Sequence, residues 1–164
     1  MLENKIKNIL INILMDNTGS TTVILEAIIS KMLLVNIIDQ KEIRNINSLK
    51  WNGTTVKRES ILSADKVDMS RNIVFINWDM LDCALKDQLT AGDVPIGKLI
   101  MDMDYRRKII HKGKICSADE FRMFDISVQV GDYVKAYEIF KSDICLFFIL
   151  EFFNMNHILE NIME

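Results

Sequence analysis

The sequence contains little proline and glycine, and it has no long apolar run. One proline and six glycines occur among 164 residues, so no stretch is typical of a flexible linker. The longest uninterrupted apolar stretch, ICLFFIL, is too short to cross a bilayer as a helix. Hydrophobic residues make up 49% and charged residues 26% of the chain, which is the balance of a globular protein. We therefore expect a single domain over residues 1–164 with no membrane partner.

Cysteine and histidine are also scarce. Cys83, Cys116 and Cys145 lie far apart, and none belongs to a CxxC pair. This pattern indicates reduced thiols and predicts a cytoplasmic protein. His111 and His157 have no cysteine or histidine partner at a ligand-like spacing, so we expect no zinc site.

The chain has no strong excess of either charge. It carries 20 basic and 23 acidic residues, a formal charge of −3, and its longest basic run is Arg106–Lys108. Nucleic acid would therefore find no extended basic surface, and we expect no nucleic-acid partner. A monomer is the default expectation.

The hydrophobic pattern changes along the chain. Apolar residues three or four apart predict a helix near the N-terminus, and a polar elbow, DNTGSTT, separates it from a second helix over 22–33. Further helices are expected over 78–89 and from Pro95, with a short one over 118–124 and an ambiguous tail from Asn154. Runs rich in β-branched and aromatic residues predict strands over 35–43, 56–64, 71–78, 106–115, 133–140 and 144–153. This order favours an α+β fold with one mainly antiparallel sheet covered by helices.

Three charged residues fall on strand faces that are otherwise largely apolar. Alternation places Arg58 beside Leu62, whereas Arg71 opens the next strand, and Glu151 is the only charge within 144–153. Burying such a charge without a partner costs on the order of several kcal/mol. The pattern alone favours an internal ion pair of Arg58 or Arg71 with Glu151. One glutamate cannot neutralise two arginines, however, so a bound anion with two carboxylates stays open.

At these positions the sequence resembles the chorismate pyruvate-lyase (4-hydroxybenzoate synthase) family. Four segments match in order, VKRESILSADK, SRNIVFINWDML, DVPIGKLIM and FFILEFF, and the elbow segment GSTT matches less specifically. The resemblance covers roughly Leu14 to Phe153. It implies a six-stranded antiparallel sheet with a helical flap that closes over an internal ligand pocket.

The resemblance also implies an activity. A carbon–oxygen lyase of this family converts chorismate to 4-hydroxybenzoate and pyruvate, and it needs no cofactor or metal. Arg58 would bind the ring carboxylate of the substrate. Arg71 and Glu151 would be the catalytic residues, the first at the pyruvyl carboxylate and the second at the hydroxyl that becomes phenolic.

The same resemblance supplies further substrate-binding positions and an alternative. The backbone N–H of Ile96, beside Gly97, would complete carboxylate binding, and Thr21 would lie in the elbow that closes over the ligand. The fold is shared by effector domains of GntR-type regulators, so a non-catalytic domain that binds an aromatic or sugar acid is the alternative. A complete regulator is not expected, because only about fifty residues precede the strand of Arg58 and the fold needs most of them. A lyase that forms 3-hydroxybenzoate also stays open.

Overall fold

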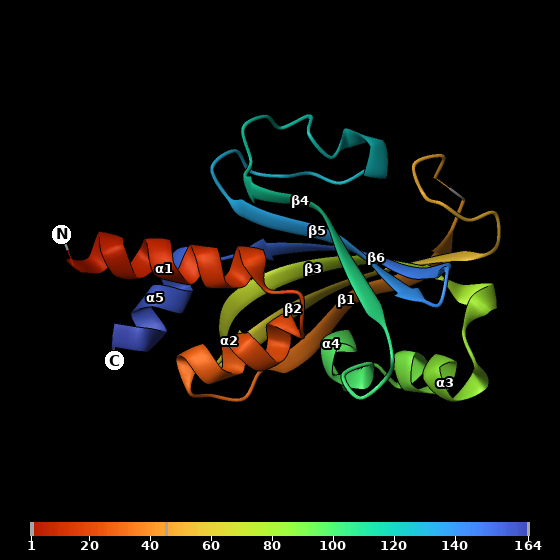
Figure 1. Cartoon of the computed structure of the whole chain (residues 1–164), viewed down its shortest axis with the longest axis horizontal. Coiled ribbons are helices and arrows are strands. Elements are labelled where there is room, and N and C mark those ends of the chain that lie inside the picture. Colours follow the sequence, from red (N-terminus) through yellow and green to blue (C-terminus); the bar gives the residue numbers. More distant parts are fainter. Residues whose placement is uncertain (1, 45, 164) are drawn as a thin grey trace.

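Six antiparallel strands form one open sheet in the order β1-β2-β3-β6-β5-β4 (Figure 1). The structure is a computed structural model that describes residues 2–44 and 46–163. The strands are β1 (Leu34–Ile43), β2 (Thr55–Ala64), β3 (Val67–Asn77), β4 (Arg106–Lys114), β5 (Tyr133–Lys141) and β6 (Ile144–Phe153). Together with the helices that pack on this sheet, they confirm the predicted α+β fold.

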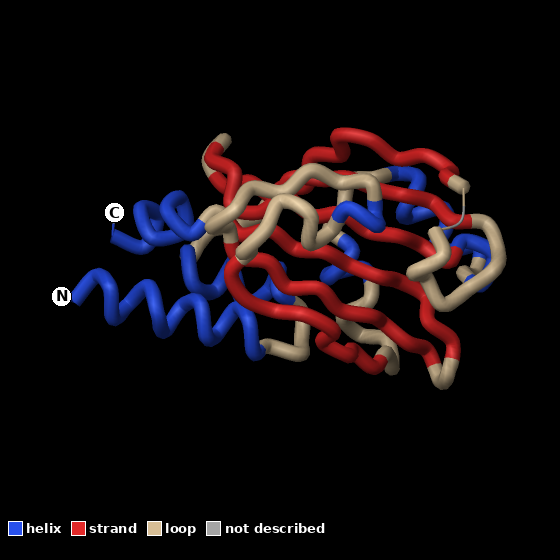
Figure 2. Tube along the Cα trace, turned by 90° about the horizontal axis from the view of Figure 1, so that it is seen from above, coloured by secondary structure: helices blue, strands red, loops and turns tan. Residues whose placement is uncertain are grey.

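The helices gather on one side and at one end of the sheet. They are α1 (Leu2–Asp16), α2 (Thr21–Ile29), α3 (Cys83–Ala91), α4 (Ile96–Leu99) and α5 (Met155–Met163), with the 3₁₀ turns η1 (Trp78–Met80) and η2 (Arg122–Phe124). Helices α2, α3 and α4 lie on one side of the sheet (Figure 1), whereas α1 and α5 extend beyond its end and bring the two termini together (Figure 2). No helix in the described part of the chain is both long and apolar enough to span a membrane.

Some helix boundaries differ from the sequence prediction. The helix expected over 22–33 ends at Ile29, because Ser30 takes a left-handed conformation. The helix expected over 78–89 is divided, because the side chain of Asp82 accepts a hydrogen bond from the N–H of Leu85 and starts α3 anew. The expected helix over 118–124 is reduced to η2, and the ambiguous tail forms α5.

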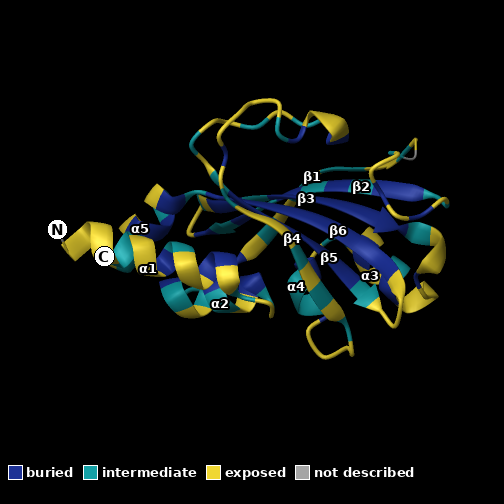
Figure 3. Cartoon of the chain, turned by 45° about the horizontal axis from the view of Figure 1, so that its top comes forward, coloured by how far each residue is buried: buried dark blue, intermediate teal, exposed yellow. Residues whose placement is uncertain are grey.

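The two central strands carry the core. β3 and β6 have neighbours on both edges, and both strands are buried along most of their length (Figure 3). On the helical side, Val74, Phe147 and Ile149 pack together under α3 and α4. On the other side, Phe75 and Phe148 stack around Phe124, which is supplied by the long connection between β4 and β5. The sheet therefore separates two apolar layers, and the site lies in the helical one.

A tight hairpin sets the register of β2 against β3. Asp65 and Lys66 both take positive φ angles, as a two-residue turn between twisted strands requires. A β-bulge between Leu62 and Ser63 then shifts the pairing by one residue. Beyond the bulge, Ser60 lies directly opposite Asn72. This shift decides which side chains of β3 face the helices.

Candidate functional site

A row of buried polar side chains crosses four adjacent strands on the helical side. Ser60 of β2 lies opposite Asn72 of β3, Asn72 lies opposite Glu151 of β6, and Glu151 lies opposite Lys135 of β5. All four residues are buried. Buried polar groups are rare without hydrogen-bond partners. A row of four buried polar side chains is therefore an unusual feature of a protein interior.

Ser60, Asn72 and Glu151 of this row border a small, partly open cavity, which we call the Arg58 cavity. Its water-accessible volume is about 30 Å³, enough for one or two water molecules. The sheet forms its floor, while the start of α2 and the start of α4 cover it. The polar side chains and the glycine that line it are Thr22, Arg58, Ser60, Asn72, Gly97, Tyr137 and Glu151.

Arg58 is the unusual member of this cavity. Its side chain is 1% exposed, and among the described residues no carboxylate lies within ion-pair distance of it. Within the described structure its guanidinium donates two long hydrogen bonds of 3.5 Å, to the carbonyls of Leu89 and Val94, and Nε has no hydrogen-bond partner there. Burial lowers the pKa of Arg58 to about 10. Among the described residues the guanidinium is therefore a buried cation without a counter-ion, and the expected ion pair of Arg58 with Glu151 is wrong.

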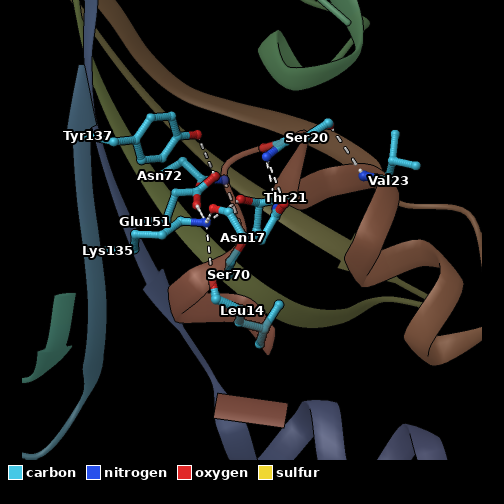
Figure 4. Close-up of polar contacts among 11 residues, drawn as sticks. Leu14, Asn17, Ser20, Thr21, Val23, Ser70, Asn72, Lys135, Tyr137 and Glu151 are labelled. Atoms are coloured by element: carbon cyan, nitrogen blue, oxygen red, sulfur yellow. Dashed lines mark hydrogen bonds and ion pairs between the residues drawn. The ribbon is translucent and has the colours of Figure 1, made fainter. Parts of the chain in front are cut away.

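Glu151 instead pairs with a lysine that the sequence analysis missed. Lys135 Nζ lies 3.5 Å from Glu151 Oε2, and the hydroxyl of Tyr137 donates to Oε1 at 2.9 Å (Figure 4). Glu151 Oε2 accepts no hydrogen bond within the described structure. The signal for Lys135 was present, because alternation puts it on the same strand face as Tyr137 and Ile139. A lysine on such an apolar face needs an acidic partner.

The environment shifts the pKa values of these partners. Burial, followed by the charge of Glu151, raises the pKa of Tyr137 well above its usual value of 10. Burial lowers the pKa of Lys135, and the attraction of Glu151 acts in the opposite direction. Tyr137 is therefore kept as a neutral hydrogen-bond donor to Glu151.

We expect this tyrosine to make the protein sensitive to alkaline pH. Unfolded tyrosine ionises near pH 10, whereas folded Tyr137 keeps its proton, so its contribution is complete below pH 10 and is lost as pH rises through its folded pKa. The loss reaches about 1.4 kcal/mol per pH unit above 10. Urea unfolding of the wild type and of Tyr137→Phe from pH 8 to about pH 11 tests this. Equal slopes for the two proteins would contradict the assignment.

Arg71 lies on the opposite face of the sheet. Its Nε donates to Glu59 Oε1 at 2.7 Å, another guanidinium N–H donates to the carbonyl of Ser127 at 3.1 Å, and the group lies over the ring of Phe152. It borders a separate, open groove of about 700 Å³, which we call the Arg71 groove. The two predicted arginines therefore do not converge on one ligand. The bulge before Ser63 is the reason, because a one-residue shift reverses the face.

The remaining predicted positions lie at the cover of the cavity. Ile96 and Gly97 line it, whereas the hydroxyl of Thr21 is turned to Lys135 and accepts its hydrogen bond at 2.8 Å. A Cβ at position 97 would lie 2.9 Å from Ser20 Oγ and 3.0 Å from Thr22 Oγ1. Glycine at this position thus allows α4 to approach the start of α2. The ligand contacts expected of Thr21, Ile96 and Gly97 remain predictions.

Comparison with known proteins shows the fold. No family model matches the sequence, and no curated protein matches it. The effector domain of PhnF from Mycobacterium smegmatis has a TM-score of 0.57 and 9% identity, over 84% of this chain and 89% of that one. The C-terminal domain of the histidine utilization repressor from Pseudomonas syringae pv. tomato has a TM-score of 0.50 and 8% identity, over 74% and 90%. Gene product SA0254 from Staphylococcus aureus has a TM-score of 0.51 and 14% identity, over 76% and 84%.

These neighbours correct the predicted activity. They include effector domains of GntR-family regulators, whose fold is the one that chorismate lyase also has. The resemblance seen in the sequence is therefore a resemblance of fold. Regulator effector domains are not enzymes, so the prediction of a carbon–oxygen lyase is contradicted. The geometry agrees, because Arg71, expected to act in catalysis, does not face the Arg58 cavity.

Proposed function

We propose that this chain is a non-catalytic ligand-binding domain that takes up a small organic anion, an aromatic or sugar acid, in the Arg58 cavity. The observation that carries the proposal is the buried guanidinium of Arg58, which has neither a counter-ion nor a partner for Nε in the part of the chain that the structure describes. Such an arrangement costs several kcal/mol unless something compensates it. A bound carboxylate supplies the compensation.

The chemistry of the cavity suits this ligand. A guanidinium presents parallel N–H groups that match a carboxylate in a bidentate manner. Lys135 and Glu151 neutralise each other, so Arg58 leaves the cavity with one formal positive charge. The hydroxyls of Thr22 and Ser60 and the amide of Asn72 offer further hydrogen bonds to the rest of the ligand. The effector domains with the same fold support a binding role rather than a chemical one.

Matched pairs of charged and neutral compounds test the proposal. Benzoate and gluconate should raise the unfolding temperature, and titration calorimetry should show one site per chain. A ligand at one hundred times its Kd stabilises the folded state by about 2.7 kcal/mol. Benzamide and glucose, which lack the carboxylate, should have little effect at equal ionic strength. Equal binding of the neutral partners, or no binding of either acid, would contradict an anion site.

A further inference from the structure

We propose that Lys135 is a positioning residue that fastens the elbow between α1 and α2 (residues 17–20), and with it the start of α2 that covers the Arg58 cavity, so that a ligand binds only after this contact opens. The inference rests on the proposed function, because it takes the Arg58 cavity as the ligand site. Nothing in the family resemblance assigned a role to Lys135.

The contacts of Lys135 point toward the elbow. Its side chain is 1% exposed, and Nζ donates to Leu14 O at 2.9 Å, Asn17 O at 3.3 Å and Thr21 Oγ1 at 2.8 Å (Figure 4). An ammonium group has three N–H donors, and the elbow and its flanking helices accept all three. The contact with Glu151 is thus an ion pair without its own hydrogen bond.

The acceptors of Lys135 also explain why its hydrogen bonds to the elbow and the flanking helices are strong. Leu14 belongs to the last turn of α1, whose carbonyls have no partner within the helix. A cation at this end also interacts favourably with the helix dipole. Lys135 therefore connects strand β5 of the sheet with the end of α1 and the first residue of α2.

The cavity in its present state is too small for an organic acid. Its water-accessible volume is about 30 Å³, whereas sites for small organic ligands measure roughly 300–1,000 Å³. The floor cannot yield easily, because its strands are paired on both edges. The cover is the part that can move.

The two helices of the cover are joined to each other. Lys98 of α4 forms an ion pair of 2.6 Å with Glu26 of α2, and Gly97 packs closely against Thr22. A movement of α2 therefore displaces α4 with it. The Lys135 hydrogen bond to Thr21 joins the start of this cover to the sheet, so it opposes opening.

This geometry predicts that the cavity opens more often when the hydrogen bond between Lys135 and Thr21 is removed. For a ligand that binds only the open state, the apparent Kd is the intrinsic Kd divided by the fraction of molecules that are open. Removing one hydrogen bond to a charged donor should raise that fraction about tenfold. Thr21→Val removes the hydroxyl but keeps the volume of the side chain.

A cysteine probe measures opening without any ligand. Ser60 lies buried in the floor of the cavity, so Ser60→Cys places a thiol where only an open state exposes it. Iodoacetamide modification at position 60 is followed by peptide mass spectrometry, with and without Thr21→Val. Thr90→Val is the matched control, because it removes an exposed hydroxyl bond to Lys86 O in α3. The native Cys145, which is buried in the apolar layer on the other side of the sheet, reports general loosening.

The result we expect is local. Thr21→Val should raise the modification rate at position 60 about tenfold, with Cys145 unchanged, and Thr90→Val should change neither rate. An unchanged rate at position 60, or an equal increase at Cys145, would overturn the inference. Because no ligand is used, this result is independent of whether benzoate or gluconate binds, and the two proposals can fail separately.

Discussion

We expect Arg58→Met to lower affinity for the bound acid at least about 30-fold while leaving the protein as stable as the wild type or more stable. Truncating one member of a buried charge pair costs roughly 2–5 kcal/mol of binding free energy. In the unliganded protein the same change removes a desolvated cation for which the described residues supply no counter-ion. Replacing even a buried ion pair by apolar side chains is often neutral or stabilising by about 1–4 kcal/mol, and an unpaired cation has no such attraction to lose. Calorimetry and urea unfolding of the same preparations measure both quantities.

Arg71→Met is the matched control. Arg71 is partly exposed and is paired with Glu59 on the other face of the sheet. Its replacement should leave acid binding unchanged and should lower the free energy of unfolding by about 1 kcal/mol or less. If acid binding is lost in this variant and retained in Arg58→Met, the ligand site lies in the Arg71 groove and not in the Arg58 cavity. A large loss of stability in Arg58→Met would show that the arginine is structural.

The largest effect on stability is expected for Lys135→Met. This change leaves Glu151 buried with Tyr137 as its remaining partner among the described residues, and it removes the donor from the end of α1 and from Thr21. Breaking a buried pair in this way costs about 3–5 kcal/mol. Urea unfolding at neutral pH measures the loss. Lys112→Met, which removes an exposed ion pair with Asp16, should cost about 1 kcal/mol or less.

A second substitution separates the ion pair from the elbow contacts. Lys135→Met combined with Glu151→Leu removes both charges, so the uncompensated carboxylate no longer contributes. The losses in the free energy of unfolding of Lys135→Met and Glu151→Leu are measured separately and added. The loss of the double variant should be smaller than this sum by about 1–3 kcal/mol. Strictly additive losses would mean that Lys135 and Glu151 do not stabilise each other.

The strands and the burial of Arg58 could be predicted from the sequence. Period-two alternation in β2 and the apolar run of β6 are local signals, and the structure confirms both strands. Alternation also places Arg58 on the face that carries Leu62, which requires no knowledge of neighbouring strands. Local sequence alone therefore suffices to predict a buried arginine in β2.

The convergence of charged residues could not be predicted in the same way. Which lysine meets Glu151 depends on β5 lying beside β6, and the strand order is a property of the whole sheet. The position of Arg71 depends on the bulge at Leu62 and Ser63, because one extra residue in β3 turns its side chain to the other face. Without that bulge Arg71 would lie opposite Ser60, on the face of Arg58. A single irregularity thus decided between a site with two arginines and a site with one.

The most direct test of the account follows the Arg58 guanidinium itself by nuclear magnetic resonance. The Arg58 Nε–H resonance, assigned by its absence in Arg58→Met, should shift and exchange more slowly with water when benzoate or gluconate is added. The Arg71 resonance should stay unchanged, since its Nε already donates to Glu59. Saturating binding of an acid without any change in the Arg58 resonance would contradict the claim that this buried arginine binds the carboxylate of the ligand.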